Sequence, residues 1–330
     1  DYYFGIPASL DMDPYLYIEN DHAVVFPSEE IEKSDHRRQN GGGFWRAGPI
    51  APGFRHDEVL GKITAKAIER LEIMASGDNP FFLYVPLTAP HTPWLPAAEF
   101  RDRSEAGYYG DFCVQVDYSV GRILDALEQF GSEEETLVIF TSDNGSHWPV
   151  GDIEKWGHKA NLDYRGQKAD IWEGGHRVPF IARWKGRIVP GESIGELLCL
   201  TDIYASLAEL TGQEPDEVEA EDSYSFLPLL RGEELVEPPR DSIVHHSVNG
   251  VFAVRKGPWK LIEGLGSGGF TQPASIEPEE GGAQGQLYNL EDDPAESNNL
   301  WLERPDIVKE LAALLDEIRQ ESDGDPQAAE

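Results

Sequence analysis

The stretch ETLVIFTSDNGSHWP, residues 135–149, places an apolar run directly before an acid, an amide and a glycine. The run from 136 to 141 predicts a buried strand, because it is short, apolar and bounded by polar residues. Asp143 and Asn144 follow at the tip of that strand. Asp-Asn-Gly favours a tight turn with left-handed backbone. Carboxylate and amide oxygens are also the ligands that Ca²⁺ and Mg²⁺ prefer. The stretch therefore leaves two hypotheses, a turn and a hard-metal site.

The segments before this strand predict an α/β sheet. Apolar residues recur at helical spacing over about 56–76 and 108–130, and the apolar run 81–87 predicts a second buried strand. Helices and strands alternating at these lengths are typical of a sheet covered on both faces. In such sheets, ligands gather beyond the carboxyl ends of the strands. His91 follows one predicted strand and the Asp-Asn pair follows the other, which favours the metal hypothesis.

A polar loop, residues 145–177, follows the 136–141 strand and is long enough to be functional. Lys168 in this loop is a positive point charge suited to an anionic tetrahedral group, although by itself it would be read as a solvated lysine. His158 is either a substrate contact or an ordinary loop residue. Arg177 is expected to be structural and to pair with Glu173.

The chain beyond the loop predicts the end of one domain and a second, smaller one. A strand at VPFIARW and a helix at TDIYASLAELTG precede a Glu- and Pro-rich segment, 213–240. Three short runs with turn signals between them then predict antiparallel strands, and a final helix begins at Pro305. We therefore predict an α/β domain over 1–240 and an α+β subdomain of sheet plus helix over 241–330.

Charge and composition exclude some partners. The chain has 61 acidic and 27 basic residues, a formal charge of −34, so nucleic acid and anionic membranes would be repelled. No apolar stretch is long enough for membrane insertion, and we find no signal peptide. Cys113 and Cys199 match no metal spacing and lie in apolar runs, which favours two buried thiols over a disulfide.

These residue types suit ester hydrolysis at sulfur or phosphorus. A metal and Lys168 would stabilise the anionic group, while His91 would donate a proton to the leaving oxygen near neutral pH. Trp94 would serve either as a stacking platform for a sugar or ring, or as a lid over the core. No nucleophile stands out.

Three motifs give a resemblance to a known family. FFLYVPLTAPHTPW (81–94), TLVIFTSDNG (136–145) and RGQKADIWEGGHRVPFI (165–181) resemble, in this order and spacing, the type I formylglycine-dependent, arylsulfatase-like sulfatases of the alkaline-phosphatase superfamily. The segments GVFAVRKGPWKLI and GQLYNLEDDPAESNNL resemble that family's C-terminal subdomain. The resemblance implies an alkaline-phosphatase-like mixed sheet flanked by helices, with 1–240 as the C-terminal part of the catalytic domain.

The resemblance also implies roles for four residues. Asp143 and Asn144 match the family's calcium ligands, His91 the histidine that protonates the leaving alcohol, and Lys168 the lysine that holds a sulfate oxygen. The family's formylglycine nucleophile arises from a Cys/Ser-x-Pro-x-Arg motif, which this chain does not contain. The family's paired acidic calcium ligands and second lysine–histidine pair are absent as well. We therefore expect a C-terminal portion of a sulfatase, inactive alone and weak in calcium affinity, whose nucleophile lies upstream.

The expected function of the full-length protein is calcium-dependent hydrolysis of a sulfate ester, with a sulfated carbohydrate or other sulfated small molecule as substrate. Two alternatives stay open: a phosphoesterase of the same superfamily, and a non-catalytic chain that binds carbohydrate. The resemblance implies export to the periplasm or the cell exterior. The sequence specifies neither the individual substrate nor the oligomeric state.

Overall fold

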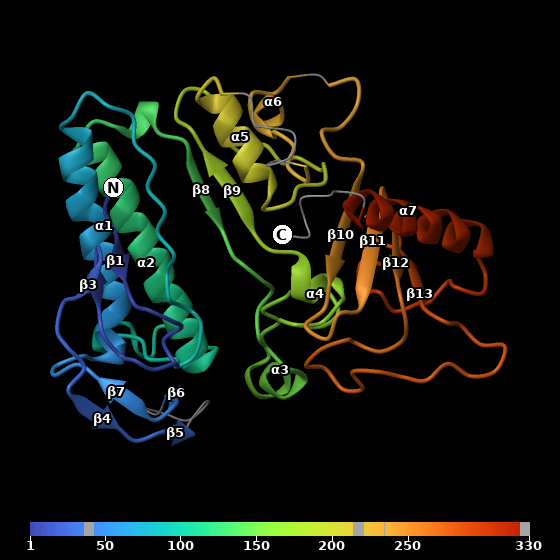
Figure 1. Cartoon of the computed structure of the whole chain (residues 1–330), viewed down its shortest axis with the longest axis horizontal. Coiled ribbons are helices and arrows are strands. Elements are labelled where there is room, and N and C mark those ends of the chain that lie inside the picture. The colour runs from blue at the N-terminus through green and yellow to red at the C-terminus, as the bar shows by residue number, and fades with distance from the viewer. Residues whose placement is uncertain (36–42, 214–220, 234, 324–330) are drawn as a thin grey trace. The chain divides into compact units, whose positions relative to one another are not determined.

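The computed structural model describes residues 1–35, 43–213, 221–233 and 235–323. The chain forms two compact units, Asp1–Thr136 and Leu137–Glu330 (Figure 1). In the described ranges, no helix combines the length and the apolar character that a membrane crossing requires.

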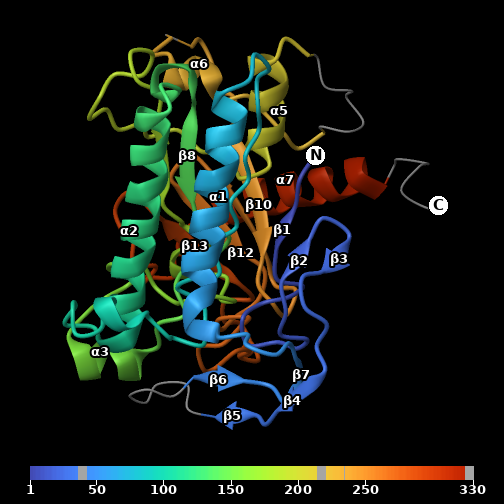
Figure 2. The same cartoon turned by 90° about the vertical axis from the view of Figure 1, so that its left-hand side faces the viewer.

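The first unit combines small antiparallel sheets with two long helices (Figure 2). Its strands pair as β1–β2–β3, β4–β7 and β5–β6. The elements are β1 (Phe4–Gly5), β2 (Ile18–Glu19), β3 (His22–Ala23), β4 (Glu29–Ile31), β5 (Ser34–Asp35), β6 (Phe44–Trp45), β7 (Gly48–Ile50), α1 (Val59–Ala75) and α2 (Gly107–Gln129).

Helices α1 and α2 confirm the two predicted helices and pack against each other. Val59, Ile63 and Ala67 of α1 are buried, in agreement with their helical spacing. Helix α2 ends where Gly131 adopts a φ of +72° and its amide donates to the Glu128 carbonyl at 3.0 Å. A glycine stop of this kind is a common C-terminal cap.

The predicted buried strand at 81–87 is wrong. Among the described residues no strand pairs with this segment, and Phe82 and Tyr84 are 71% and 75% exposed. Val85 and Leu87 point the other way and pack against the core of the first unit. The apolar pattern thus reports extended chain correctly, but a strand also requires a hydrogen-bonding partner.

The second unit contains two sheets. Strand β8 pairs antiparallel with β9, and β10 to β13 form a four-stranded antiparallel sheet in sequence order. The elements are β8 (Val138–Thr141), α3 (Val150–Trp156), α4 (Glu173–His176), β9 (Phe180–Arg183), α5 (Asp202–Leu210), α6 (Leu227–Leu230), β10 (Ser242–His246), β11 (Phe252–Lys256), β12 (Trp259–Ile262), β13 (Gln286–Asn289) and α7 (Pro305–Asp323).

Most of the strands and helices predicted beyond residue 136 are confirmed. Strands β8 and β9 form where predicted but are only half-buried, with Ile181 59% exposed, because no further described strand extends their sheet. Helices α5 and α7 and strands β10 to β12 also match, and β13 is an additional strand. The division of the chain at residue 240 stays a prediction; in the structure, the four-stranded sheet belongs to the same compact unit as β8.

Both faces of the four-stranded sheet are covered. On one face Val254, Leu261 and Leu287 pack against α7. On the other face Ala253, Ile262 and Tyr288 pack against a two-residue segment of the 145–177 loop, Ile171 and Trp172. The loop is therefore part of the core of the second unit.

A buried ionic cluster joins the same two elements. Lys260 of β12 is fully buried, and its Nζ lies 3.1 Å from Glu173 Oε1 and 2.9 Å from Glu296 Oε1. Arg177 and Arg255 reach Glu173 Oε2 at 3.4 Å and 3.6 Å, which confirms the predicted Arg177–Glu173 pair. Burial raises the pKa of Glu296. At Glu173 the three cations outweigh the effect of burial and lower its pKa.

Replacing Lys260 with methionine is expected to lower the free energy of unfolding of the second unit by about 3–5 kcal/mol, because two carboxylates lose their buried counter-charge. Lys256→Met is the matched control, since its Nζ pairs with Asp241 between exposed side chains. That pair should contribute less than about 1 kcal/mol. Urea unfolding measures both variants, and equal losses would contradict the assignment of Lys260.

Two half-buried histidines of the second unit make its stability depend on pH. The rings of His176 and His245 lie 4.2 Å apart, and burial lowers the pKa of His176 from 6.5 to about 4 and that of His245 well below its ordinary value. Between these pH values the unfolded chain binds protons that the folded chain does not, so stability falls as pH falls.

The free energy of unfolding is therefore expected to decrease from pH 6.5 to pH 4, with His176 contributing up to about 3 kcal/mol of the decrease. His176→Gln should flatten this part of the profile, whereas His22→Gln, at an exposed histidine, should leave it unchanged. Denaturant titrations across this range measure the slope. An unchanged slope in His176→Gln would rule out the assignment.

Candidate active site

Asp143 and Asn144 directly follow β8 with their oxygens available. The Asn144 Nδ2 donates to the Gly145 carbonyl at 2.9 Å, and no described residue donates to its Oδ1. Asp143 is exposed, and within the described ranges its carboxylate has no hydrogen bond or ion pair. Neither residue, nor Gly145, has a positive φ, so the left-handed turn considered from the sequence is not formed.

Gly145 fixes this segment against the end of the 145–177 loop. Its amide donates to the Gly175 carbonyl at 2.9 Å. A Cβ atom at Gly145 would lie only 1.9 Å from the Gly174 carbonyl oxygen. The close approach of the two backbones therefore requires glycine at this position.

Lys168 is held beside the same segment by its backbone. The Lys168 amide donates to the Ser146 carbonyl at 3.1 Å. Asn161 brackets Ser146, since its Oδ1 accepts from the Ser146 amide at 2.8 Å and its Nδ2 donates to the Ser146 carbonyl at 3.0 Å. Lys168 is half-buried, and among the described residues no acid pairs with its Nζ. The second unit thus brings together Asp143, Asn144 and Lys168.

The residues after Lys168 are anchored to the four-stranded sheet and its loops. The fully buried Asp170 accepts from the Gln167 amide at 3.0 Å and from the Thr271 amide at 3.0 Å. The Ile171 amide donates to the Ser267 carbonyl at 2.8 Å, and the Glu173 amide to Glu296 Oε2 at 2.6 Å. Lys168 therefore projects from a fixed backbone although it lies in a loop.

Arg165 strengthens the same anchor. Its guanidinium lies 3.7 Å from the Trp172 ring centroid and donates to the Glu296 carbonyl at 2.8 Å. Trp172 in turn donates through its Nε1 to Gln286 Oε1 at 2.9 Å. Most of the RGQKADIWEGG motif therefore anchors the loop to the sheet.

Two proposed substrate contacts occupy different environments. His158 is exposed in the loop, and its ring packs edge-on at 6.0 Å from that of Trp148. Trp94, in the first unit, is only 6% exposed and packs against Tyr109. Its burial favours the lid over the core that the sequence left open as the alternative to a stacking platform.

His91 lies in the first unit and has a defined hydrogen bond. Its Nδ1 is 2.7 Å from the Thr92 carbonyl oxygen, and its side chain is 41% exposed. The buried carboxylate of Asp11 lies 3.7 Å from the same nitrogen. The sequence reading missed Asp11; a charged residue in the otherwise neutral run FGIPASLDM is the signal that could have drawn attention to it.

The oxygens of Asp143 and Asn144 fit calcium in kind but not in number. Calcium takes six to eight oxygen ligands. Among the residues that the structure describes, no group of three or more His, Cys, Asp or Glu side chains could hold a metal ion. Of a calcium shell, the described residues would therefore supply a part and not the whole.

Neither cysteine fits the formylglycine position. Cys113 and Cys199 are free, as predicted, although half-buried and not fully buried. Burial raises the pKa of Cys113 to about 11, which keeps it a thiol at neutral pH. Neither residue begins a Cys-x-Pro-x-Arg motif.

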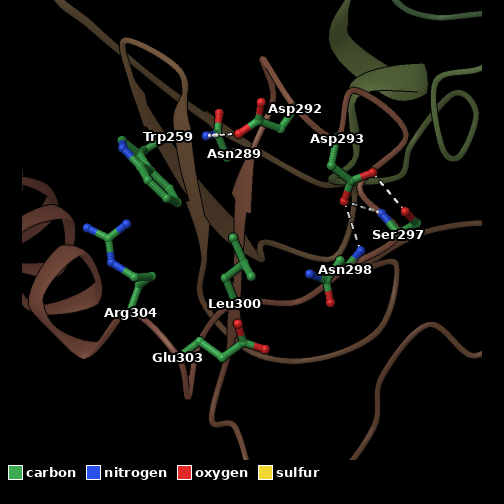
Figure 3. A pocket seen from close by; sticks show the side chains of 9 residues that line it. All are labelled: Trp259, Asn289, Asp292, Asp293, Ser297, Asn298, Leu300, Glu303 and Arg304. Atoms are coloured by element: carbon green, nitrogen blue, oxygen red, sulfur yellow. Dashed lines mark hydrogen bonds between the residues drawn. The ribbon is translucent and has the colours of Figure 1, made fainter.

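A surface pocket of about 580 Å³ lies beside the four-stranded sheet (Figure 3). Its acids are engaged locally, since Asp293 accepts from the amides of Ser297 and Asn298 at 2.8 Å. The Arg304 guanidinium stacks 5.0 Å from the Trp259 ring centroid. None of the predicted site residues lines this pocket, so we assign it no part of the active site.

Gly145→Ala is expected to lower the free energy of unfolding of the second unit by about 1–3 kcal/mol, because the added methyl group collides with the Gly174 carbonyl. Gly151→Ala is the control, since a Cβ there meets open space in α3 and alanine favours helix. Urea unfolding should show opposite signs for the two variants. Equal effects would contradict the close approach at Gly145.

Comparisons with known proteins show the family of the chain. Residues 17–213 match the family model described as Sulfatase. The N-acetylgalactosamine-6-O-sulfatase of Bacteroides thetaiotaomicron is 32% identical to this chain, over 97% of the chain and 68% of that protein. Human arylsulfatase A is 34% identical over 68% of the chain and 45% of its own length.

Solved structures give the same result. A structure from a study of glycosaminoglycan metabolism by Bacteroides thetaiotaomicron superposes with a TM-score of 0.81 at 30% identity, covering 97% of this chain and 72% of that one. A sulfatase from Pseudoalteromonas sp. superposes with a TM-score of 0.65 at 25% identity, covering 80% and 53%. The chain therefore belongs to the sulfatase family of sulfuric ester hydrolases and has its alkaline-phosphatase-like α/β fold, as the sequence predicted.

Proposed function

We propose that this chain supplies the sulfate-binding lysine, the leaving-group acid and two calcium ligands for hydrolysis of a sulfated carbohydrate. The observation that carries the proposal is the backbone contact between Lys168 and Ser146, 3.1 Å long, two residues beyond Asn144. It holds the backbone of a lysine, unpaired among the described residues, next to the segment that carries Asp143 and Asn144. An anionic ester whose oxygens face both the lysine and a calcium ion would use both features.

Lys168 binds the sulfate group in this proposal. The chain carries a formal charge of −34, so an anionic substrate needs a local positive charge. Lys168 is tied through its backbone to a rigid loop, so binding the anion requires little reorganisation. Its ammonium group also stabilises negative charge that develops on the ester oxygens.

His91 protonates the leaving alcohol. A carbonyl oxygen accepts and never donates, so the contact with the Thr92 carbonyl places a proton on Nδ1. The Nε2 is then the ring atom that exchanges a proton with substrate. An imidazole can serve as a general acid in this way.

Asp143 and Asn144 would hold a calcium ion together with ligands from outside these two residues. Calcium supplies further positive charge for the sulfate oxygens when it is bound. The formylglycine nucleophile is proposed to lie in sequence upstream of Asp1, and no step is assigned to either cysteine of this chain. His158 is proposed to contact the carbohydrate, and Trp94 to support the His91 loop from the core.

The sulfated-carbohydrate class rests on one relative in particular. The protein aligned over 97% of this chain carries the name N-acetylgalactosamine-6-O-sulfatase. We therefore propose a 6-sulfated amino sugar, or a glycosaminoglycan that contains it, as the first substrate to test. Export to the periplasm or the cell exterior is part of the same proposal, because calcium is plentiful outside the cell.

The test begins with the coding sequence upstream of Asp1. A reading frame that contains Cys/Ser-x-Pro-x-Arg, preceded by paired aspartates, is expected. The protein made from that frame, with its nucleophile matured, should release sulfate from N-acetylgalactosamine 6-sulfate. A threonine nucleophile with phosphate release, or a start codon directly before Asp1, would overturn the proposal in favour of a phosphoesterase or a binding chain.

In that longer protein, Lys168→Ala is expected to lower kcat/KM for the sulfate ester about 100-fold, because a fixed cation at the sulfate is lost. Lys159→Ala is the matched control, since Lys159 is an exposed lysine of the same loop and pairs with Asp163. Steady-state sulfate release measures both variants. A loss in the control as large as in Lys168→Ala would refute the specific role of Lys168.

A further inference from the structure

Asp11 is a buried acid whose carboxylate the fold does not use. The residue is 5% exposed, yet among the described residues the carboxylate accepts one hydrogen bond, from the Ser9 hydroxyl. An ionised carboxylate has about four acceptor sites. Burying one with so few partners costs free energy, so a purely structural residue here would more simply be neutral.

In this segment the backbone carbonyl of Asp11 accepts the hydrogen bonds that hold the fold. Its carbonyl oxygen accepts from the Tyr15 hydroxyl at 3.0 Å and from the Arg46 amide at 3.0 Å. Burial raises the pKa of Tyr15 to about 12, which keeps that hydroxyl protonated. These contacts would form with any side chain at position 11. They hold the carboxylate in place without involving it.

In the described part of the chain, His91 is the cation-forming group within ion-pair distance of this carboxylate. The Asp11 Oδ1 lies 3.7 Å from His91 Nδ1, the nitrogen that also contacts the Thr92 carbonyl at 2.7 Å. The Thr92 carbonyl lies at hydrogen-bond distance, and the Asp11 carboxylate, at 3.7 Å, acts through its negative charge, so both favour a proton on Nδ1. The opposite nitrogen, Nε2, then carries the lone pair of the neutral ring, and the His91 side chain is 41% exposed.

We propose that Asp11 is a positioning residue for His91: its carboxylate holds the imidazole as the Nδ1–H tautomer, which makes Nε2 the atom that transfers a proton. Asp11 acts through His91 and does not touch substrate. The catalytic use of that tautomer rests on the function proposed for His91. The tautomer itself does not, and it is measured separately.

The wild-type chain gives the first test. Long-range ¹H–¹⁵N spectra of the ¹⁵N-histidine-labelled chain at pH 8 report the protonated nitrogen of each neutral imidazole, and His91→Gln assigns the signal. The expected result is Nδ1–H at His91. A predominant Nε2–H form would overturn the proposal before any change at Asp11 is made.

Asp11→Asn is the decisive variant. The Asp11 Oδ1 accepts from Ser9 and is also the oxygen 3.7 Å from Nδ1, so an asparagine that keeps the Ser9 contact leaves a neutral acceptor near the ring and removes the negative charge. The share of the Nδ1–H tautomer should then fall, because the charge that favours a proton on Nδ1 is lost. Asp13→Asn, at an exposed acid two residues away, should leave the tautomer unchanged. An unchanged His91 tautomer in a folded Asp11→Asn chain would refute the coupling.

Ser9→Ala covers the case in which Asp11→Asn does not fold. Removing the hydroxyl frees the Asp11 carboxylate to rotate and should weaken the Nδ1–H preference without adding a donor. No change in the tautomer of this variant would count against the proposal.

Kinetics in the longer, matured protein separate this inference from the proposed function. Asp11→Asn should lower kcat for the sulfate ester about 10- to 100-fold with little change in KM, since proton transfer and not binding is affected. His91→Gln should lose at least as much, and the double variant should lose no more than His91→Gln alone. Full activity in His91→Gln would refute the proposed role of His91 while leaving the tautomer result intact.

Discussion

Lys260 is the residue on which the second unit depends. Its buried ammonium lies between Glu173, on the 145–177 loop, and Glu296, beyond β13. Two carboxylates could not be buried together without a counter-charge, because the cost of desolvating each exceeds what packing returns. With Lys260 in place the loop closes one face of the sheet through Ile171 and Trp172. The loop and the sheet therefore fold as one unit.

The candidate site is rigid because it lies on the 145–177 loop, which is packed on the four-stranded sheet. Glu173 is the first residue of α4. The carbonyl of Gly175, two residues later, accepts a hydrogen bond from the amide of Gly145, which lies just beyond β8. Lys168 is tied to the same strand end through Ser146. A binding group must be held to a fraction of an ångström to be effective. Here the precision comes from buried backbone contacts rather than from the side chains that would meet substrate.

In the first unit the buried acid Asp11 has a different role. Glu173 and Glu296 are matched by cations and hold the fold together, whereas Asp11 has one hydroxyl donor and faces a half-exposed histidine. Buried charge that is fully paired is structural in this protein. The carboxylate of Asp11 has fewer partners, and we propose that it positions the catalytic group His91.

Sequence patterns predicted the elements that depend on local physics. Helices α1, α2 and α7 follow apolar spacing, and α2 ends at the glycine that can adopt a φ of +72°. The 81–87 run failed because its apolar pattern does not say whether a partner strand is present. The partners of Lys260 and Asp11 could not be found by pattern, since Glu296 lies 36 residues from Lys260 in sequence and His91 lies 80 residues from Asp11. Such long-range pairings are set by the fold as a whole.

The predicted site residues divide in the same way. Asp143, Asn144 and Lys168 were expected together from their motifs, and the second unit does hold them together. Trp94 was ambiguous because an aromatic beside prolines suits a platform and a core equally well; its burial was decided by packing against Tyr109. The buried anchors that make the loop rigid left little trace beyond a lysine inside the apolar strand WKLI.

Native-state amide hydrogen exchange tests the account of the loop most directly. If Lys260 makes loop and sheet one object, the amides of Gly145, Lys168 and Glu173 should open with free energies within about 1 kcal/mol of those in the interior strand β12. All three are hydrogen-bonded in the structure, to Gly175, Ser146 and Glu296. Exchange of these amides at the rates of an exposed loop, while β12 stays protected, would contradict the account.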